Sequence, residues 1–246
     1  WAADDQFGQM VDMVVRDYAT WERPDPAGTM DPSADMGDSF PFLRCYDVYD
    51  GHSWAGGIHG NDLGNNQESA SEAVFSYAAM IRWAEQRIAA TEAGTEAHQQ
   101  AQEMRDTAVF LYTHETTAMW EYWFDEAGDS TPDGWGADVG NETNADRPDL
   151  SVAGTDFEYA PQVWGSGYWR HVYWYLGDPV ELYGINWLPI GTHSFFLGKN
   201  QQYAQTLWDK LLEARSFDTY GIDHPGRNWP AGWEVAALGY RAMPAP

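Results

Sequence analysis

Apolar residues recur at helical spacing along most of this chain. The pattern predicts helices at residues 5–19, 68–90, 95–123, 168–176, 179–187, 201–215 and 232–242. Polar segments rich in glycine and proline separate them at 23–39, 40–64 and 125–158. No segment alternates apolar and polar residues clearly enough to predict a sheet. We therefore expect a single all-α domain over residues 1–246, an α/α toroid or helical array whose loops gather at one rim.

The helix predicted at 68–90 begins with two glutamates. Glu68 and Glu72 are four residues apart and would share one helix face. Apolar residues line both sides of this helix, with Ala70, Val74, Tyr77, Ile81, Ala84 and Ile88 opposite the glutamates and Phe75, Ala79 and Trp83 beside them. A helix that is apolar on both sides is buried. Ionised carboxylates in such a place need partners or a function.

Two structural interpretations of these glutamates remain open. Ser69 and Glu72 fit the S-x-x-E pattern of a capping box. A solvated acidic first turn is also favoured by the helix dipole. The two-sided apolar pattern favours a functional carboxylate pair over both. Glu115, on the helix predicted at 95–123, is equally compatible with a cleft carboxylate and with a buried structural pair.

The chain is strongly acidic. It carries 38 Asp and Glu against 13 Lys and Arg, a formal net charge of −25, and its lysines are Lys199 and Lys210. Such a surface repels nucleic acids and anionic membranes, and no apolar run is long enough to span a bilayer. The aromatic content argues against disorder. We expect a halophilic surface, on which salt screens the self-repulsion, with an ordinary acidic secreted protein as the alternative.

Aromatic residues are abundant, with 14 Trp and 14 Tyr in 246 residues. Their faces stack on sugar rings, so a carbohydrate site is one interpretation and a tryptophan-rich core is the other. His52, His59 and Asp62 match no zinc spacing. Ser194 lies in no nucleophile elbow, and no glycine-rich phosphate loop is present, so we expect no metal and no cofactor. Cys45 is alone, which excludes an intrachain disulfide.

Two segments carry a specific signature. Residues 47–57 are DVYDGHSWAGG, and residues 64–74 are GNNQESASEAV. Together they resemble the signature of glycoside hydrolase family 81, in which a D-P-Y-E-G-H-S-W-A-S-G segment precedes G-N-N-Q-E-S-x-S-E-A-V. Three further segments resemble motifs of this family and follow the same order along the chain. They are residues 40–44 (FPFLR), 163–165 (VWG) and 183–190 (YGINWLPI). The resemblance covers most of the chain, with Asp50 in place of the usual Glu and Gly56 in place of Ser.

The resemblance implies the (α/α)6 barrel of this family and an inverting endo-β-1,3-glucanase. Inversion needs a general acid on the departing oxygen and a general base that activates water on the opposite face. The match makes Glu68 the base and Glu72 a partner that holds the water or tunes the base, and two carboxylates this close titrate as a coupled pair. The partner is then a β-1,3-glucan polysaccharide, and the location is extracellular or at the cell surface.

Candidate substrate contacts follow from the same motifs. They are Asp47, Asp50, His52, Trp54, Asn66, Gln67, Trp164 and Trp187. For His52 and the tryptophans, packing in the core is the alternative to substrate contact.

One family motif has no counterpart here. The family's general acid is an aspartate in a D-H-H-F-H-Y-G-Y motif that lies upstream of the signature, and β-rich domains precede it. The chain opens with Trp1, without a Met or a signal peptide, so we expect the C-terminal part of a larger protein. Its missing N-terminal part would then supply the acid. Other options are that another chain supplies it, that Asp47 or Asp50 replaces it, or that the protein is a non-catalytic glucan-binding or structural surface protein of the same fold.

Overall fold

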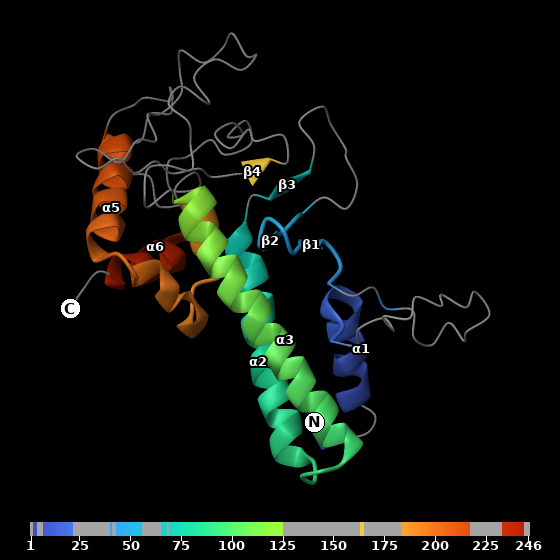
Figure 1. Cartoon of the computed structure of the whole chain (residues 1–246). Coiled ribbons are helices and arrows are strands. Elements are labelled where there is room, and N and C mark those ends of the chain that lie inside the picture. The colour runs from blue at the N-terminus through green and yellow to red at the C-terminus, as the bar shows by residue number, and fades with distance from the viewer. Residues whose placement is uncertain are drawn as a thin grey trace.

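Two long helices form the centre of the molecule. The computed structural model describes residues 2–3, 7–21, 40, 43–55, 65–67, 69–124, 163–164, 184–216 and 233–243. Helices α2 (Ala70–Ala90) and α3 (Glu96–Ala118) run antiparallel, side by side (Figure 1). Gly94, in the turn between them, has a φ of +85°, a left-handed conformation that glycine adopts without strain. Thr95 then caps α3 by accepting a hydrogen bond from the backbone N–H of His98 at 3.3 Å.

Helix α1 (Phe7–Ala19) packs against one side of this pair. A buried cluster joins the three helices and includes Val15, Ala19, Tyr77, Met80, Ala84, Met104, Ala108 and Leu111. The helix contacts its neighbours through Val11, Val15, Tyr18 and Ala19. On the other side of α1, the side chains of Met10, Met13 and Val14 are exposed.

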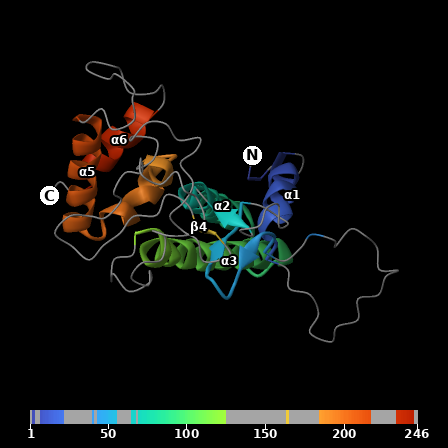
Figure 2. The ribbon, with the colours of Figure 1, turned by 90° about the horizontal axis from the view of Figure 1, so that it is seen from above.

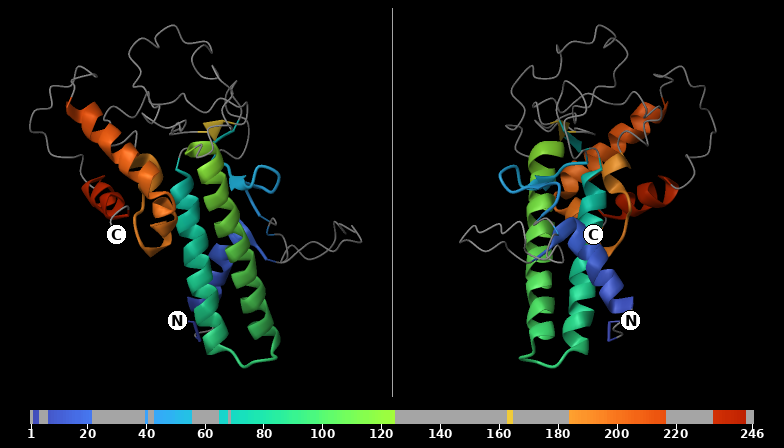
Figure 3. Two further views of the ribbon diagram at one scale, coloured as in Figure 1. Left: turned by 60° about the vertical axis from the view of Figure 1, so that its left-hand side comes forward. Right: turned by 90° about the vertical axis from the view of Figure 1, so that its right-hand side faces the viewer.

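A second buried cluster lies at the other end of the helix pair. It joins the start of α2 to the π-helical turn η2 (Met119–Trp123), which continues α3. Helices α5 (Gln201–Ser216) and α6 (Trp233–Ala242) and the 3-10 turns η4 (Ile185–Trp187) and η5 (Thr192–Gly198) complete this cluster. Helices α5 and α6 lie on the side of the pair away from α1, as seen from above in Figure 2 and from two sides in Figure 3.

Two short antiparallel ladders stand at the end of the pair where α2 begins and α3 ends (Figure 1). Strand β1 (Tyr46–Asp47) pairs with β2 (His52–Ser53), and β3 (Asn66–Gln67) pairs with β4 (Val163–Trp164). The sequence predicted no strands. Two-residue strands are too short to show an alternating pattern, which explains the omission.

The helices predicted from the sequence match α1, α2, α3 with η2, α5 and α6, and their ends agree within two residues. The helix predicted at 168–176 lies outside the described residues. Of the helix predicted at 179–187, the described part contains only the short turn η4 and the residue before it. None of the described helices is both long and apolar enough to cross a membrane.

Candidate active site

The first signature segment folds into a tight hairpin. In β1 and β2, Tyr46 pairs with Ser53 and Asp47 with His52. The Asp47 carboxylate accepts hydrogen bonds from the backbone N–H groups of Tyr49 at 2.8 Å and Asp50 at 3.2 Å. The sequence predicted that Asp47 contacts substrate, but its carboxylate closes the turn of its own hairpin, as aspartate does in Asx turns.

His52 is packed inside the protein rather than presented to a ligand. Its side chain is 1% exposed, and its Nδ1 lies 2.8 Å from the carbonyl oxygen of Ser53. The rings of Trp54, Tyr122 and Trp123 surround it, with centroids 4.5, 5.7 and 5.0 Å away. Burial lowers the pKa of His52, which favours the neutral ring. The predicted substrate contact is therefore corrected to a core residue, while Trp54 beside it is half-buried.

Ser53 connects the hairpin to a buried carboxyl group. Its backbone N–H donates to Glu115 Oε2 at 2.7 Å, and its hydroxyl donates to Glu115 Oε1 at 3.0 Å. Glu115 is fully buried on α3, and burial raises the pKa of its carboxyl to about 8, against the opposing effect of the two bonds from Ser53. Of the two interpretations that the sequence left open, the structure favours a buried structural group.

The second signature segment reaches the same serine. Gln67, buried in β3, donates from Nε2 to the Ser53 hydroxyl at 2.7 Å. Its side chain, predicted to bind substrate, thus holds two parts of the protein together. Asn66 pairs through its backbone with Trp164, but both side chains lie outside the described residues, as does the whole of Glu68.

The start of α2 is held by a distant segment. The buried side chain of Asn186 accepts a hydrogen bond from the backbone N–H of Ala70 at 3.1 Å. Ser69 donates to the carbonyl oxygen of Ile185 at 3.3 Å, and Ser71 donates to that of Leu188. The residues of the 183–190 motif therefore supply the cap, and Ser69 makes no side-chain cap bond within its own helix. The capping box that the sequence suggested for Ser69 is not formed.

Removal of the Asn186 cap should cost stability at this end of the molecule. In Asn186→Ala the N–H of Ala70 loses its buried acceptor, and we expect the free energy of unfolding to fall by about 1–2 kcal/mol. Urea unfolding followed by tryptophan fluorescence measures the loss. Thr95→Ala, which removes the exposed cap of α3, is the matched control and should cost about 1 kcal/mol or less. Equal losses in the two variants would contradict a special role for Asn186.

Trp187 belongs to the core. It has no exposed surface and stacks on Tyr240, with centroids 3.9 Å apart and an angle of 8° between the rings. The predicted contact with a sugar is thus corrected, because a side chain without exposed surface cannot stack on one.

The face of α2 that carries Glu72 is open. Glu72 is exposed in the first turn, and Phe75, one turn further, is 46% exposed and touches His193 at 5.0 Å between ring centroids. The sequence predicted that α2 is buried on both sides, but only the stripe with Ala70 and Val74 is fully covered. Glu68 lies outside the described residues, so its pairing with Glu72 stays a prediction.

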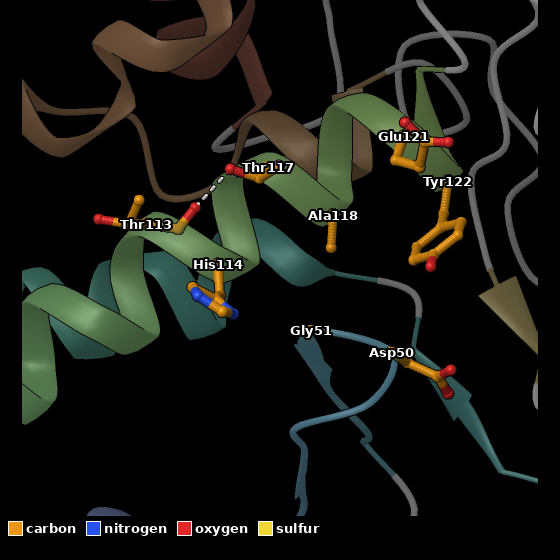
Figure 4. A pocket seen from close by; sticks show the side chains of 8 residues that line it. All are labelled: Asp50, Gly51, Thr113, His114, Thr117, Ala118, Glu121 and Tyr122. Carbon is orange, nitrogen blue, oxygen red and sulfur yellow. Dashed lines mark hydrogen bonds between the residues drawn. The ribbon is translucent and has the colours of Figure 1, made fainter.

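A hollow of about 300 Å³ lies between the hairpin turn and the end of α3. Figure 4 shows His114, Ala118 and Tyr122 on successive turns, with side chains directed toward Asp50 and Gly51. The spacing of four residues explains why the three share one face. The hollow thus combines an aromatic ring, an imidazole and a carboxylate, a mixture suited to a polar ligand with apolar faces. Among the described residues, no group of acidic, histidine or cysteine side chains is arranged to hold a metal ion.

The structure gives roles to Ser53 and Asn186, which the sequence did not single out. Ser53 joins the first signature segment to Glu115 on α3, and Asn186 joins the 183–190 segment to the start of α2. For Glu115 a signal exists in the sequence, because it continues the buried stripe of α3 through Met104, Ala108 and Leu111. A carboxylate on such a stripe is expected to be buried and hydrogen-bonded.

Comparison with known proteins supplies the family. The model of the glycosyl hydrolase family 81 C-terminal domain matches residues 1–132, which contain both signature segments, α2 and α3. The chain belongs to glycoside hydrolase family 81. The resemblance inferred from the two motifs is thereby confirmed.

Individual relatives extend the likeness over most of the chain. A glucan endo-1,3-beta-D-glucosidase of Acetivibrio thermocellus is 33% identical over 99% of this chain and 24% of its own length. A protein of the same name from Thermobifida fusca is 32% identical over 86% of this chain and 22% of its own. The chain thus spans about a quarter of the length of these relatives.

A solved family 81 structure confirms the fold class. A mutant of the glycoside hydrolase family 81 protein from Clostridium thermocellum superposes on 98% of this chain and 27% of its own, with a TM-score of 0.65 and 30% identity. The predicted all-α fold, part of an α/α toroid, is therefore correct.

Proposed function

We propose that this chain carries the general base of an endo-β-1,3-glucanase, with Glu68 as the base and Glu72 as its partner. The main support is the anchoring of the two residues that flank Glu68. Gln67 donates to Ser53, Ser69 donates to Ile185, and both flanking residues are buried. A base that must activate water at one position needs such rigid support. The name shared by the two relatives gives the substrate class, β-1,3-glucan.

The proposed reaction is hydrolysis of a β-1,3-glucosidic bond with inversion. Ionised Glu68 takes a proton from a water molecule, whose oxygen attacks the anomeric carbon opposite the departing sugar. An acid in another part of the family 81 protein protonates the glycosidic oxygen as that bond breaks. Glu72 holds the water or tunes the base.

The hollow beside Asp50 is the proposed place for a glucosyl unit of the substrate. Asp50 is half-buried at its edge, and Tyr122 offers an aromatic face. A carboxylate accepts hydrogen bonds from sugar hydroxyls, and the ring stacks against the apolar face of the sugar. Trp54 is half-buried and remains a second candidate contact, together with Asn66 and Trp164.

The net charge of −25 supports a protein that works in concentrated salt. At about 1 M salt the Debye length falls to about 3 Å, so neighbouring surface carboxylates no longer repel strongly. A polymeric substrate and such a surface favour an extracellular or cell-surface location. These two properties form part of the proposal.

The test is hydrolysis of soluble β-1,3-glucan by the intact protein that contains this chain. We expect new reducing ends from β-1,3-glucan and none from β-1,4-glucan, with more activity at about 2 M than at about 0.1 M NaCl. Nuclear magnetic resonance of the first products should show the α-anomer, which identifies inversion. A protein that binds the glucan without cleaving it would contradict the catalytic proposal.

A further inference from the structure

Glu115 is an unusual residue to find at the centre of a protein. Its side chain is fully buried, and no ion pair in the described part of the chain involves it. A buried carboxyl group is costly unless its hydrogen bonds are satisfied. Leucine or methionine, which occupy two other positions of its stripe on α3, would avoid that cost. The polar side chain therefore needs a reason.

Among the described residues, the hydrogen bonds of Glu115 all lead to one serine. Both of its oxygens bond to Ser53, one to the backbone N–H and the other to the hydroxyl. Two bonds to one residue fix both the position and the orientation of β2, which a single bond does not do. The Ser53 hydroxyl also accepts from Gln67 at 2.7 Å. A continuous chain of hydrogen bonds, here called the relay, thus runs from Glu115 on α3 through Ser53 on β2 to Gln67 on β3.

The end of this relay lies one peptide bond from Glu68. Gln67 is fixed by its side chain to Ser53 and by its backbone to Val163 in β4. On the other side, Ser69 is fixed to the 183–190 segment. Because Glu115 sits on a long, well-packed helix, the relay transmits the rigidity of α3 to the segment that carries the base.

We propose that Glu115 is a positioning residue, which through Ser53 fixes Gln67, the residue that directly precedes Glu68 in the chain. The inference rests on the proposed function of Glu68 and adds to it a group that does not touch the substrate. Positioning of this kind affects kcat strongly, because a shift of about 1 Å at a reacting group costs up to about 100-fold in rate.

The carboxyl group acts in its neutral form. The titratable groups that face it are the hydroxyls of Tyr46 on β1 and Tyr77 on α2, and burial raises the pKa of both, so they are uncharged too. A neutral carboxyl group accepts from the Ser53 N–H with one oxygen, and its O–H donates to the Ser53 hydroxyl, so this second bond runs in the opposite direction from the one that an ionised carboxylate accepts from that hydroxyl. Glutamine offers the same pair of groups, an oxygen and an N–H, at nearly the same positions.

Three variants of the intact protein test the inference. Glu115→Gln keeps an acceptor and a donor toward Ser53, and we expect kcat on soluble β-1,3-glucan within about threefold of wild type. Glu115→Leu removes both, and kcat should fall by about 10- to 100-fold with KM nearly unchanged. Leu111→Ala, on the same buried stripe one turn away, is the matched control for lost packing. It should lower the melting temperature while kcat stays near wild type.

Hydrogen–deuterium exchange provides a readout that does not depend on catalysis. Glu115→Leu should accelerate exchange of the backbone amides of Ser53 and Gln67, and Leu111→Ala should leave them slow. Equal kcat in Glu115→Leu and wild type, or equal exchange in the two variants, would overturn the inference. An inactive wild type would overturn the proposed function instead, and the exchange result would still decide whether the relay positions the segment.

Discussion

Glu68→Gln is expected to lower kcat on soluble β-1,3-glucan by about 1,000-fold, with KM changed by less than about threefold. A positioned general base contributes about 10²- to 10⁴-fold to the rate, and glutamine cannot accept the proton from water. Because glutamine keeps the size of the side chain, substrate binding should survive, which separates kcat from KM. Steady-state kinetics of the intact protein in molar salt measures both constants. Glu72→Gln should cost less, about 10-fold, since a partner of the base leaves the base itself in place.

A nucleophile that needs no base should restore part of the lost activity. In Glu68→Ala the cavity left by the side chain admits azide, which attacks the anomeric carbon from the face that water would use. The product of inversion is an α-glycosyl azide, with the proton for the departing sugar still supplied by the acid. Its detection would identify Glu68 as the base rather than as the acid.

Glu85→Gln is the matched control for these variants. It makes the same substitution on the same helix, at an exposed position toward the far end of α2. Its kcat should equal that of wild type. If the kcat of Glu68→Gln equals that of wild type, Glu68 is not the general base, whichever glucan the protein cleaves.

Local patterns were sufficient for the helices and for the family. The stripe of Ala70, Val74, Tyr77 and Ala84 predicted α2, and the same residues are buried in the structure. Two contiguous motifs were specific enough to identify glycoside hydrolase family 81. Both signals are contained in short stretches of sequence, so the remainder of the fold does not alter them.

Tertiary contacts decided what the sequence could not. The cap of α2 comes from Asn186, 116 residues away from Ala70, so the local capping box pattern gave the wrong partner. Asp47, His52 and Trp187 all lie in family motifs, and the prediction assigned them to substrate for that reason. A motif also contains the residues that hold the site in shape, and only burial and hydrogen bonds distinguish these from residues that face a ligand.

The free energy of unfolding of this protein should depend on pH because of the buried Glu115 carboxyl group. Its pKa is raised from the ordinary value of 4.5 to about 8 in the folded protein. Between these values the folded state binds a proton that the unfolded state releases. The resulting stabilisation is complete below about pH 4.5 and is lost as the pH rises through about 8. The change amounts to at most about 5 kcal/mol in the free energy of unfolding.

Glu115→Gln removes this titration and leaves the packing nearly unchanged. Relative to wild type, the variant should therefore gain stability as the pH is raised from about 5 to about 8, by a few kcal/mol. His52 and His193, whose pKa values are lowered by burial, contribute with the opposite sign. They are present in both proteins, so their contributions cancel in the difference.

Urea unfolding of both proteins across this pH range, at constant molar salt, measures the difference directly. A difference that does not change with pH would mean that Glu115 is ionised in the folded protein, with two bonds from Ser53 outweighing the cost of burial. In that case glutamine would be a poor substitute, because its N–H would face the Ser53 hydroxyl where a carboxylate oxygen accepts. The kinetic and thermodynamic results for Glu115→Gln are thus coupled. A neutral carboxyl group requires both a pH-dependent difference in stability and a nearly unchanged kcat.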